Sequence, residues 1–305
     1  MRSFLKKNAF QLLGVATVLL LALAIGLYVA YSSGFIKFEY GFDKTLSNDY
    51  CSVSRPSTSG RLHVEQTHIY DENGEEVILK GVSTHGIQWF PQFVNERLFN
   101  ELSTDWNANL VRIAMYSDAY CESPDKRSEL LDLVKQGIDY AVESDMYVIV
   151  DWHILYDNNP NMNIDSAKQF FSYMSLEYHD VPNVIFEICN EPNGNTTWDD
   201  ISEYAKQIIP IIRTNDSDSI IIVGTPDYSS DLSGAVDKPL DEYDNIMYAY
   251  HFYASGQGED DMAHLNTALE KGVPVFVSEC GLPNSDGDGE TDDVRGGACE
   301  VHPAL

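Results

Sequence analysis

The sequence predicts an α/β fold, a TIM-type (β/α)8 barrel that stops after its seventh strand and is preceded by an N-terminal transmembrane or signal segment. Short apolar runs alternate with helical patterns, which is typical of a parallel sheet. Runs such as Ile-Ile-Ile-Val at 220–223 suit strands that are covered on both faces. A doubly wound open sheet is the alternative, but the sequence lacks the glycine-rich loop with which such sheets bind nucleotides.

The first 31 residues differ in kind from the rest of the chain. Arg2, Lys6 and Lys7 precede an uncharged apolar run over residues 9–31. A helix of this length spans the ~30 Å hydrocarbon core of a bilayer, and basic residues ahead of it favour export of the chain after it. We expect residues 1–31 to be a signal-anchor or a long signal peptide, with a buried core helix as the alternative. The remaining chain is then extracellular, either anchored to the cell membrane or secreted.

Residues 32–60 have the composition of a linker, and residues 61–289 have the periodicity of the barrel domain. Residues 62–70 and 76–80, around an Asp-Glu-Asn-Gly turn, predict a hairpin that leads into the first barrel strand. The seven strand candidates are 79–83, 109–115, 146–151, 184–189, 219–224, 246–250 and 273–278. Helical periodicity lies between most of them, at 95–106, 130–142, 166–178, 198–213 and 260–269.

The composition excludes some partners. The 48 acidic and 19 basic side chains give a net charge of −29. Nucleic acids and anionic lipid surfaces both require basic groups, so we expect binding to neither, and we assign the charge to solubility. The five cysteines form no C-x-x-C pair, and the histidines form no H-x-H or H-E-x-x-H pattern. No metal or other cofactor is therefore expected.

Polar side chains stand at the ends of the predicted strands. The carboxyl ends of the strands of a parallel barrel meet at one rim, and the active sites of such barrels are built there. These ends supply His85, Arg112, Asp151 with His153, Asn190 with Glu191, His251 with Tyr253, and Glu279. The sequence therefore predicts that six strands bring polar groups to one site.

Two of these side chains, Glu191 and Glu279, are carboxylates that would face each other across the rim. Opposed carboxylates suit glycoside hydrolysis, in which one protonates the leaving oxygen while the other attacks the anomeric carbon. The attacking carboxylate must stay ionised, through hydrogen bonds or a nearby cation. Arg112 is placed to supply that cation beside Glu279, or alternatively to pair with a buried acid such as Glu187.

Five motifs carry a resemblance to a known family. They are Leu-Lys-Gly-Val-Ser-Thr-His-Gly at 79–86, Val-Ile-Val-Asp-Trp-His at 148–153, Ile-Phe-Glu-Ile-Cys-Asn-Glu-Pro at 185–192, Ala-Tyr-His-Phe-Tyr at 249–253 and Val-Phe-Val-Ser-Glu at 275–279. In this order, over about residues 62–289, they resemble glycoside hydrolase family 5, most closely its bacterial endoglucanases. The resemblance implies an endo-acting β-1,4-glucanase (cellulase) that hydrolyses β-glucan with retention, by double displacement and without a cofactor.

The resemblance also implies catalytic roles for the matching residues. Glu191 is expected to be the general acid/base and Glu279 the nucleophile. Asn190 is expected to bind the sugar 2-hydroxyl beside the bond that is cut. Tyr253 would donate a hydrogen bond to the nucleophile, and Arg112 would hold it ionised.

The remaining matches are implied to contact the substrate. His251 would tune the acid/base or touch sugar, and His85 and His153 would line the glycone side. Aromatic planes match the apolar C–H faces of β-linked glucose, and the stacking candidates are Trp89, Tyr116 and Tyr228. For Tyr116 and Tyr228, ordinary packing is the alternative, and Trp152 is expected to belong to the barrel core rather than to the sugar site.

One residue and one segment depart from the family pattern. Cys280 stands directly after the nucleophile, where the family commonly has a bulky aromatic residue. Residues 290–305 show neither the helix nor the tryptophan-bearing eighth strand that the family leads one to expect, and a frame change would explain such a tail. Because a seven-stranded barrel exposes two strand edges, we expect the chain as written to fold poorly or to be inactive.

Other functions stay open at this point. Within the same class, the sequence allows a mannanase, a xylanase or a mixed-linkage glucanase. A catalytically inactive sugar-binding protein would retain the aromatic and histidine contacts without cleaving. A metal-dependent hydrolase on the same barrel would lose its activity with a chelator.

Overall fold

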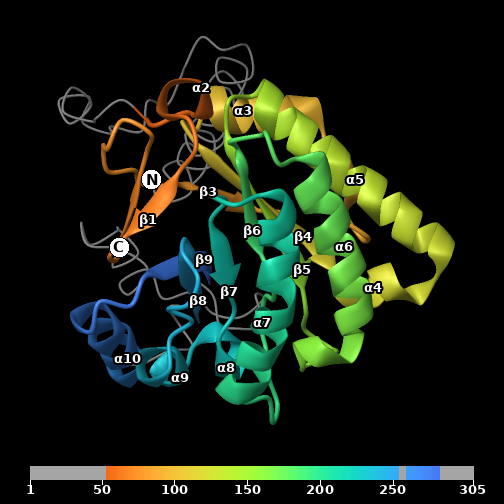
Figure 1. Cartoon of the computed structure of the whole chain (residues 1–305). Coiled ribbons are helices and arrows are strands. Elements are labelled where there is room, and N and C mark those ends of the chain that lie inside the picture. Colours follow the sequence, from red (N-terminus) through yellow and green to blue (C-terminus); the bar gives the residue numbers. More distant parts are fainter. Residues whose placement is uncertain (1–52, 254–258, 282–305) are drawn as a thin grey trace, which may run out of the picture. The chain divides into compact units, whose positions relative to one another are not determined.

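The computed structural model describes residues 53–253 and 259–281, in which a parallel sheet forms a nearly closed barrel with helices outside it (Figure 1). The strands are hydrogen-bonded in chain order: β3 (Gly81–Ser83), β4 (Leu110–Tyr116), β5 (Tyr147–His153), β6 (Val184–Glu187), β7 (Ile221–Val223), β8 (Ile246–Tyr253) and β9 (Val275–Gly281). Each of the seven predicted runs contains or overlaps one of them, which confirms the barrel. Over the described ranges, β3 and β9 each have a strand neighbour on one side.

Five helices match the predicted ones: α3 (Glu96–Thr104), α5 (Pro124–Glu143), α6 (Ile164–Glu177), α7 (Trp198–Asn215) and α10 (Glu259–Glu270). Side chains cap three of them at the N-terminus, because Asn95, Ser123 and Thr197 each accept a hydrogen bond from the first turn. The shorter elements were not expected: α2 (Pro56–Ser59), η2 (Pro91–Phe93), α4 (Ser117–Glu122), η3 (Pro160–Asn163), α8 (Pro226–Ser229) and α9 (Ser233–Asp237).

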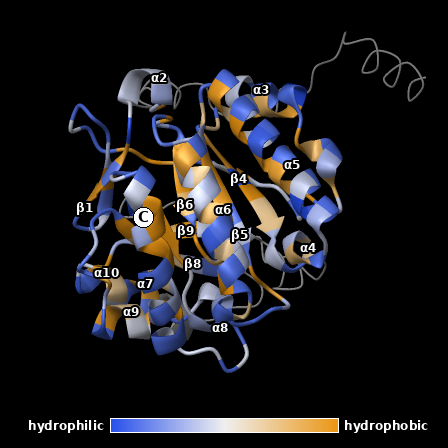
Figure 2. Cartoon of the chain, turned by 45° about the vertical axis from the view of Figure 1, so that its right-hand side comes forward, coloured by the Kyte–Doolittle hydropathy of each residue, from blue (hydrophilic) through white to orange (hydrophobic). Residues whose placement is uncertain are grey.

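Apolar side chains form two buried layers on the two faces of the sheet. The larger lies between the strands and the helices and includes Trp152, Phe170 and Phe186. The smaller fills the barrel interior and includes Tyr147, Ile149 and the corresponding residues of the other strands. Figure 2 shows the apolar strands behind α5 and α6, whose outward faces are mostly polar but include exposed apolar residues such as Leu176. The expectation that Trp152 belongs to the core is confirmed.

The hairpin at the start of the domain differs from the prediction. The stretch 62–70 is two short antiparallel strands, β1 (His63–Glu65) and β2 (His68–Tyr70), rather than one. The turn between them places Gln66 at a φ of 55°, a left-handed conformation that sequence patterns associate with Gly or Asn. The Asp-Glu-Asn-Gly turn forms as predicted, and Tyr70 bridges Glu76 across it.

The predicted domain boundaries can be compared with the structure only at the start of the barrel domain. The barrel domain begins earlier than residue 61, because Arg55 Nη1 donates to the Ala108 carbonyl at 2.7 Å and α2 lies next to it. The predicted signal segment (1–31), most of the linker and the tail (290–305) lie outside the described residues. Among the helices that the structure describes, none has the length and apolar character needed to span a bilayer.

Candidate active site

The strands change from apolar to polar along the barrel interior, which is what builds the site. Side chains of a strand alternate between its faces, so every second residue points inward. On β5 the inward series begins with Tyr147 and Ile149 and continues with Asp151 and His153. On β6 and β8 the same pattern leads from apolar residues to Glu187 and to His251. The polar residues therefore collect at the carboxyl ends of the strands, as predicted.

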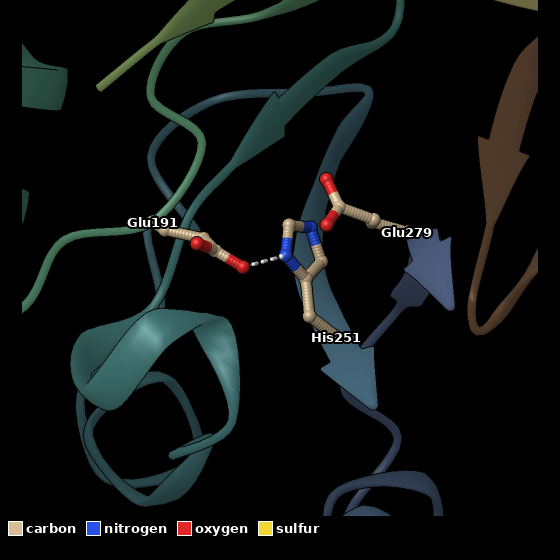
Figure 3. A group of neighbouring side chains, drawn as sticks. All are labelled: Glu191, His251 and Glu279. Atoms are coloured by element: carbon tan, nitrogen blue, oxygen red, sulfur yellow. Dashed lines mark hydrogen bonds and ion pairs between the residues drawn. The ribbon is translucent and has the colours of Figure 1, made fainter. Parts of the chain in front are cut away.

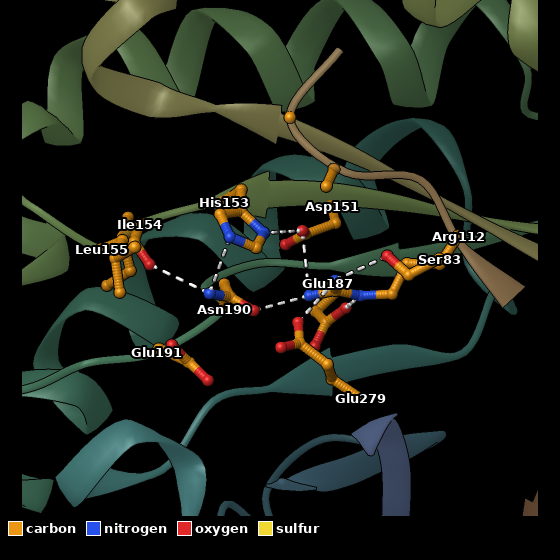
Figure 4. Close-up of polar contacts among 12 residues, drawn as sticks. Ser83, Arg112, Asp151, His153, Ile154, Leu155, Glu187, Asn190, Glu191 and Glu279 are labelled. Carbon is orange, nitrogen blue, oxygen red and sulfur yellow. Dashed lines mark hydrogen bonds and ion pairs between the residues drawn. The ribbon is translucent and has the colours of Figure 1, made fainter. Parts of the chain in front are cut away.

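Arg112 on β4 holds the centre of this polar layer (Figure 4). Its guanidinium is buried, with 2% of the side chain exposed, and contacts five side chains. The contacts are Glu187 at 2.6 Å from Nε, Asn190 at 2.7 Å and Asp151 at 2.9 Å from Nη2, and Ser83 at 3.2 Å and Glu279 at 3.3 Å from Nη1. Both interpretations of Arg112 from the sequence thus hold at once, since it pairs with the buried Glu187 and with Glu279.

Glu191 and Glu279 lie on opposite sides of His251 (Figure 3). Glu191 comes after β6 and lies 2.9 Å from Nδ1 of His251 through Oε1, and Glu279 lies on β9. One ligand-type atom from each of the three side chains lies within 4.8 Å of the other two. Tyr253, at the end of β8, donates its hydroxyl hydrogen to Oε1 of Glu279. Four residues predicted to be catalytic are therefore in one place, together with Arg112.

The surroundings of Glu279 keep it ionised. Burial opposes the charge, but His251, Arg112, His153 and the Tyr253 hydroxyl outweigh it and lower the pKa of Glu279 from 4.5 to about 2. Burial, together with the charge of this carboxylate, raises the pKa of Tyr253, so its hydroxyl remains a donor. Glu279 is thus suited to attack as a carboxylate over the whole ordinary pH range.

The surroundings of His251 raise its pKa, whereas those of Glu279 lower the pKa of that carboxyl. Burial lowers the pKa of His251, yet the hydrogen bond to Glu191 and the charges of Glu279 and Glu191 exceed that effect, so the pKa is raised. The imidazolium form is therefore favoured between the two carboxylates.

Asn190 and His153 are enclosed by protein. The Asn190 side chain is fully buried, accepts from Arg112 and donates to the Ile154 carbonyl at 3.1 Å, and its amide also lies 3.2 Å from Nε2 of His153. His153 in turn lies 2.6 Å from Asp151 through Nδ1. Their predicted sugar contacts stay predictions, while the described contacts tie both to the Arg112 layer.

Aromatic residues line one side of the site. Trp89 is 47% exposed and packs on Tyr116 with ring centroids 4.7 Å apart, and His85 lies 5.5 Å from the Trp89 ring. Tyr116 is itself buried and stacks on His153 at 4.2 Å, so it supports Trp89 from beneath. Of this group, Trp89 and His85 present surface to solvent.

Tyr228 lies in an unusual left-handed turn within α8 (Pro226–Ser229). Asp227, Tyr228 and Ser229 have φ values of 54°, 58° and 58°, three consecutive non-glycine residues in the left-handed region. Such residues cost about 1–2 kcal/mol each in backbone strain. The turn is held by Tyr228 N–H on the Pro192 carbonyl at 3.1 Å and by the Ser229 hydroxyl on the Asn190 carbonyl at 2.6 Å. It fixes the segment that carries Glu191 and leaves Tyr228 half exposed.

Gly224, just before this turn, allows the main chain at the end of β7 to lie close to the main chain at Cys189. A Cβ atom there would collide with the main-chain carbonyl of Cys189. The end of β7 can therefore lie directly against the chain that leads to Asn190 and Glu191.

Glu191, His251 and Glu279 also have the residue types of a metal site. Their described contacts disfavour that use. Nδ1 of His251 faces Glu191, and Glu279 already pairs with Arg112 and Tyr253. A buried guanidinium beside the cluster raises the cost of adding a second cation.

Comparisons with known proteins agree with this geometry. The family model "Cellulase (glycosyl hydrolase family 5)" matches residues 70–298.

The chain belongs to glycosyl hydrolase family 5.

Among related sequences of the family, Endoglucanase A of Butyrivibrio fibrisolvens is 47% identical over 234 residues, which cover 75% of this chain and 54% of that protein. An endoglucanase of Clostridium saccharobutylicum is 43% identical over 247 residues, which cover 80% of this chain and 54% of that protein. The chain thus spans about half the length of these relatives.

Solved structures of the family have the same fold. Cellulase Cel5C_n superimposes with a TM-score of 0.77 at 36% identity, covering 82% of this chain and 79% of that one. The catalytic domain of Thermobifida fusca endoglucanase Cel5A was solved in complex with cellotetraose. It superimposes with a TM-score of 0.75 at 38% identity, covering 80% of this chain and 82% of that one. The predicted family is therefore confirmed.

Three serines of the site were not predicted. Ser83 and Ser278 contact Arg112 and His251, and Ser229 holds the main chain at Asn190. Ser83 and Ser278 stand beside predicted strand-end residues, which is the one signal that the sequence offered. Cys280, noted as a departure from the family, is exposed on β9.

Proposed function

We propose that this chain is an endo-acting β-1,4-glucanase that cleaves β-glucan with retention of configuration. The observation that carries the proposal is the placement of Glu191 and Glu279 on either side of His251. A carboxylate oxygen of Glu191 lies within 4.8 Å of a carboxylate oxygen of Glu279. Retaining glycosidases hold their two carboxyl groups about 5–5.5 Å apart, whereas inverting ones leave room for a water molecule. The low pKa of Glu279 assigns it the nucleophilic role.

The reaction then has two displacements. In the first, Glu191 gives its proton to the glycosidic oxygen while an oxygen of Glu279 bonds to the anomeric carbon and the carbon–oxygen bond to the leaving sugar breaks. In the second, Glu191 takes a proton from water, the water oxygen bonds to the same carbon, and Glu279 leaves as a carboxylate. Arg112 and Tyr253 contact separate oxygens of Glu279 and so orient it in both steps.

The aromatic residues support a glucan as substrate. Trp89 comes after β3 and Tyr228 after β7, four strands away in the sheet order, so the two exposed rings belong to different parts of the rim. Rings in separate parts of the rim suit a polymer that continues past the cleaved bond in both directions. The relatives named above are endoglucanases, which favours glucan over mannan or xylan.

The test compares substrates and variants of the full chain. We expect carboxymethylcellulose to lose viscosity faster than reducing ends appear, and activity on mannan and xylan to be lower. Such activity would also overturn the expectation from the sequence that the chain as written is inactive. Glu279→Gln is expected to abolish hydrolysis and to retain cello-oligosaccharide binding, while Glu143→Gln, an exposed carboxylate at the end of α5, is the matched control. Binding without cleavage by the wild-type chain would identify the sugar-binding alternative. Loss of activity with EDTA would identify the metal-dependent one.

We further propose that the barrel domain acts outside the cytoplasm, anchored to the membrane or secreted. The uncharged run at 9–31 behind Arg2, Lys6 and Lys7 supports this. Cell fractionation of the chain with its native N-terminus tests the proposal, and recovery of all of it from the cytosol would contradict it.

A further inference from the structure

A bulge in β9 brings two consecutive residues to the site. Ala249 of β8 pairs with Phe276, but His251, two residues on, pairs with Glu279, three residues on. Neighbouring residues of a regular strand face opposite sides of the sheet, and a bulge redirects one of them. As a result Ser278 contacts His251 while Glu279 contacts Arg112.

Ser278 links His251 to a buried carboxylate. Its hydroxyl lies 2.9 Å from Nε2 of His251 and 2.6 Å from Oε1 of Glu187. The other oxygen of Glu187 accepts from Arg112 Nε at 2.6 Å. Burial raises the pKa of Glu187 and the Arg112 guanidinium opposes that rise, and the Ser278 hydroxyl donates to Oε1 of Glu187, which accepts as a carboxylate oxygen does. The single hydrogen of Ser278 therefore goes to Glu187, and its oxygen is left to accept a hydrogen from Nε2 of His251.

The second ring nitrogen of His251 also faces an acceptor, because Nδ1 lies 2.9 Å from Oε1 of Glu191. Both nitrogens can donate at once when the ring is an imidazolium. The charged groups around the ring are Glu187, Glu191 and Glu279, against Arg112 as the nearby cation. The ring is almost fully buried, so these groups rather than solvent determine its charge.

We propose that Ser278 is a positioning residue that holds His251 as an imidazolium between Glu191 and Glu279. The inference rests on the proposed glycosidase function. The charge of His251 helps to keep Glu279 ionised. Its Nδ1–H occupies Oε1 of Glu191, which leaves Oε2 of Glu191 to give the proton to the leaving oxygen and later to take one from water. Loss of the imidazolium proton therefore sets the alkaline limit of activity.

Removal of the hydroxyl tests this. Ser278→Ala takes away the acceptor at Nε2, and one hydrogen bond to a charged group corresponds to roughly one pH unit. We expect the alkaline limb of kcat/KM to move down by about that amount, with kcat falling more than KM changes. Ser278→Thr keeps a hydroxyl and should restore the wild-type limb. Ser175→Ala removes a buried hydroxyl on α6 away from the site and serves as the control.

An alkaline limb that stays in place in Ser278→Ala overturns the proposal, even if kcat falls. If Ser278→Ala does not fold, nitrogen NMR of the wild-type chain decides, with His251 assigned from a His251→Asn spectrum. Two protonated ring nitrogens at pH 7 support the proposal, and a neutral ring overturns it. This measurement needs no substrate, so a wild-type chain that shows the imidazolium but cleaves no glycan would refute the glucanase function alone.

Discussion

Arg112→Lys tests whether the geometry of the site depends on the shape of the guanidinium rather than on its charge. The three nitrogens of Arg112 reach five side chains in different directions, at 2.6–3.3 Å. A lysine ammonium presents three hydrogens from a single point. It therefore reaches at most three of the five, so at least two of these side chains lose their contact with residue 112.

The size of the effect can be worked out from these contacts. A hydrogen bond that involves a charged group contributes about 1.5–3 kcal/mol, and breaking a buried ion pair costs about 3–5 kcal/mol. We expect Arg112→Lys to lower the free energy of unfolding by about 3 kcal/mol at pH 6, a large share of the 5–15 kcal/mol typical of a domain. A misplaced Glu279 should also lower kcat about 100-fold, which corresponds to about 3 kcal/mol in the barrier.

The difference should depend on pH in a defined direction. A carboxyl pKa lowered from 4.5 to about 2 favours the folded state by about 3 kcal/mol above pH 4.5, and this contribution is lost as pH falls toward 2. Arg112 supplies part of it, so the variant should differ from the wild type more at pH 6 than at pH 3.

Urea unfolding at the two pH values and kcat on a soluble cello-oligosaccharide measure both effects. Arg97→Lys, whose side chain is exposed and pairs with Glu101 on the surface of α3, is the control and should change stability by less than about 0.5 kcal/mol. If Arg112→Lys keeps wild-type stability and more than half of kcat, the shape of the guanidinium is not what orders the site.

Three further outcomes are expected. Tyr253→Phe removes a donor to Glu279 and should raise the pKa of that carboxyl by roughly one unit, so the acid limb of a pH–rate profile between pH 2.5 and 7 moves upward; an unmoved limb contradicts this. Trp89→Ala should raise KM for cello-oligosaccharides about tenfold with little change in kcat, and equal loss in both would argue against a stacking role. Thr197→Ala breaks the capping box with Asp200 and should cost about 1 kcal/mol in thermal or urea unfolding while kcat stays unchanged.

The sequence was sufficient for the barrel and for the identity of the rim residues, for one physical reason. A strand side chain repeats with period two, and parallel strands end at one rim, so Asp151, Glu187 and His251 could be placed without knowledge of any contact. The strand bounds differ from the predicted ones by a few residues, mainly because polar ends such as Asp151-Trp152-His153 continue the strand beyond the apolar run.

Three features could not be predicted, because each depends on tertiary contacts. The bulge at Ser278 arises from pairing with β8, the left-handed turn at Tyr228 is held by hydrogen bonds to Pro192 and Asn190, and the β1–β2 turn places a glutamine at positive φ. Likewise, nothing in the pattern distinguishes the buried Tyr116 from the exposed Trp89, since both stand near strand ends.

The charge balance of the polar layer explains why two histidines accompany a single arginine. Asp151, Glu187 and Glu279 bring three carboxylates around Arg112, and burying unmatched carboxylates is costly. His153 lies against Asp151, and both His251 and His153 help to lower the pKa of Glu279. A neutral glucan brings no charge of its own to complete the balance. The histidines therefore act on the nucleophile through the protein, and replacing either by a neutral isostere should affect the acid limb of activity before it affects glucan binding.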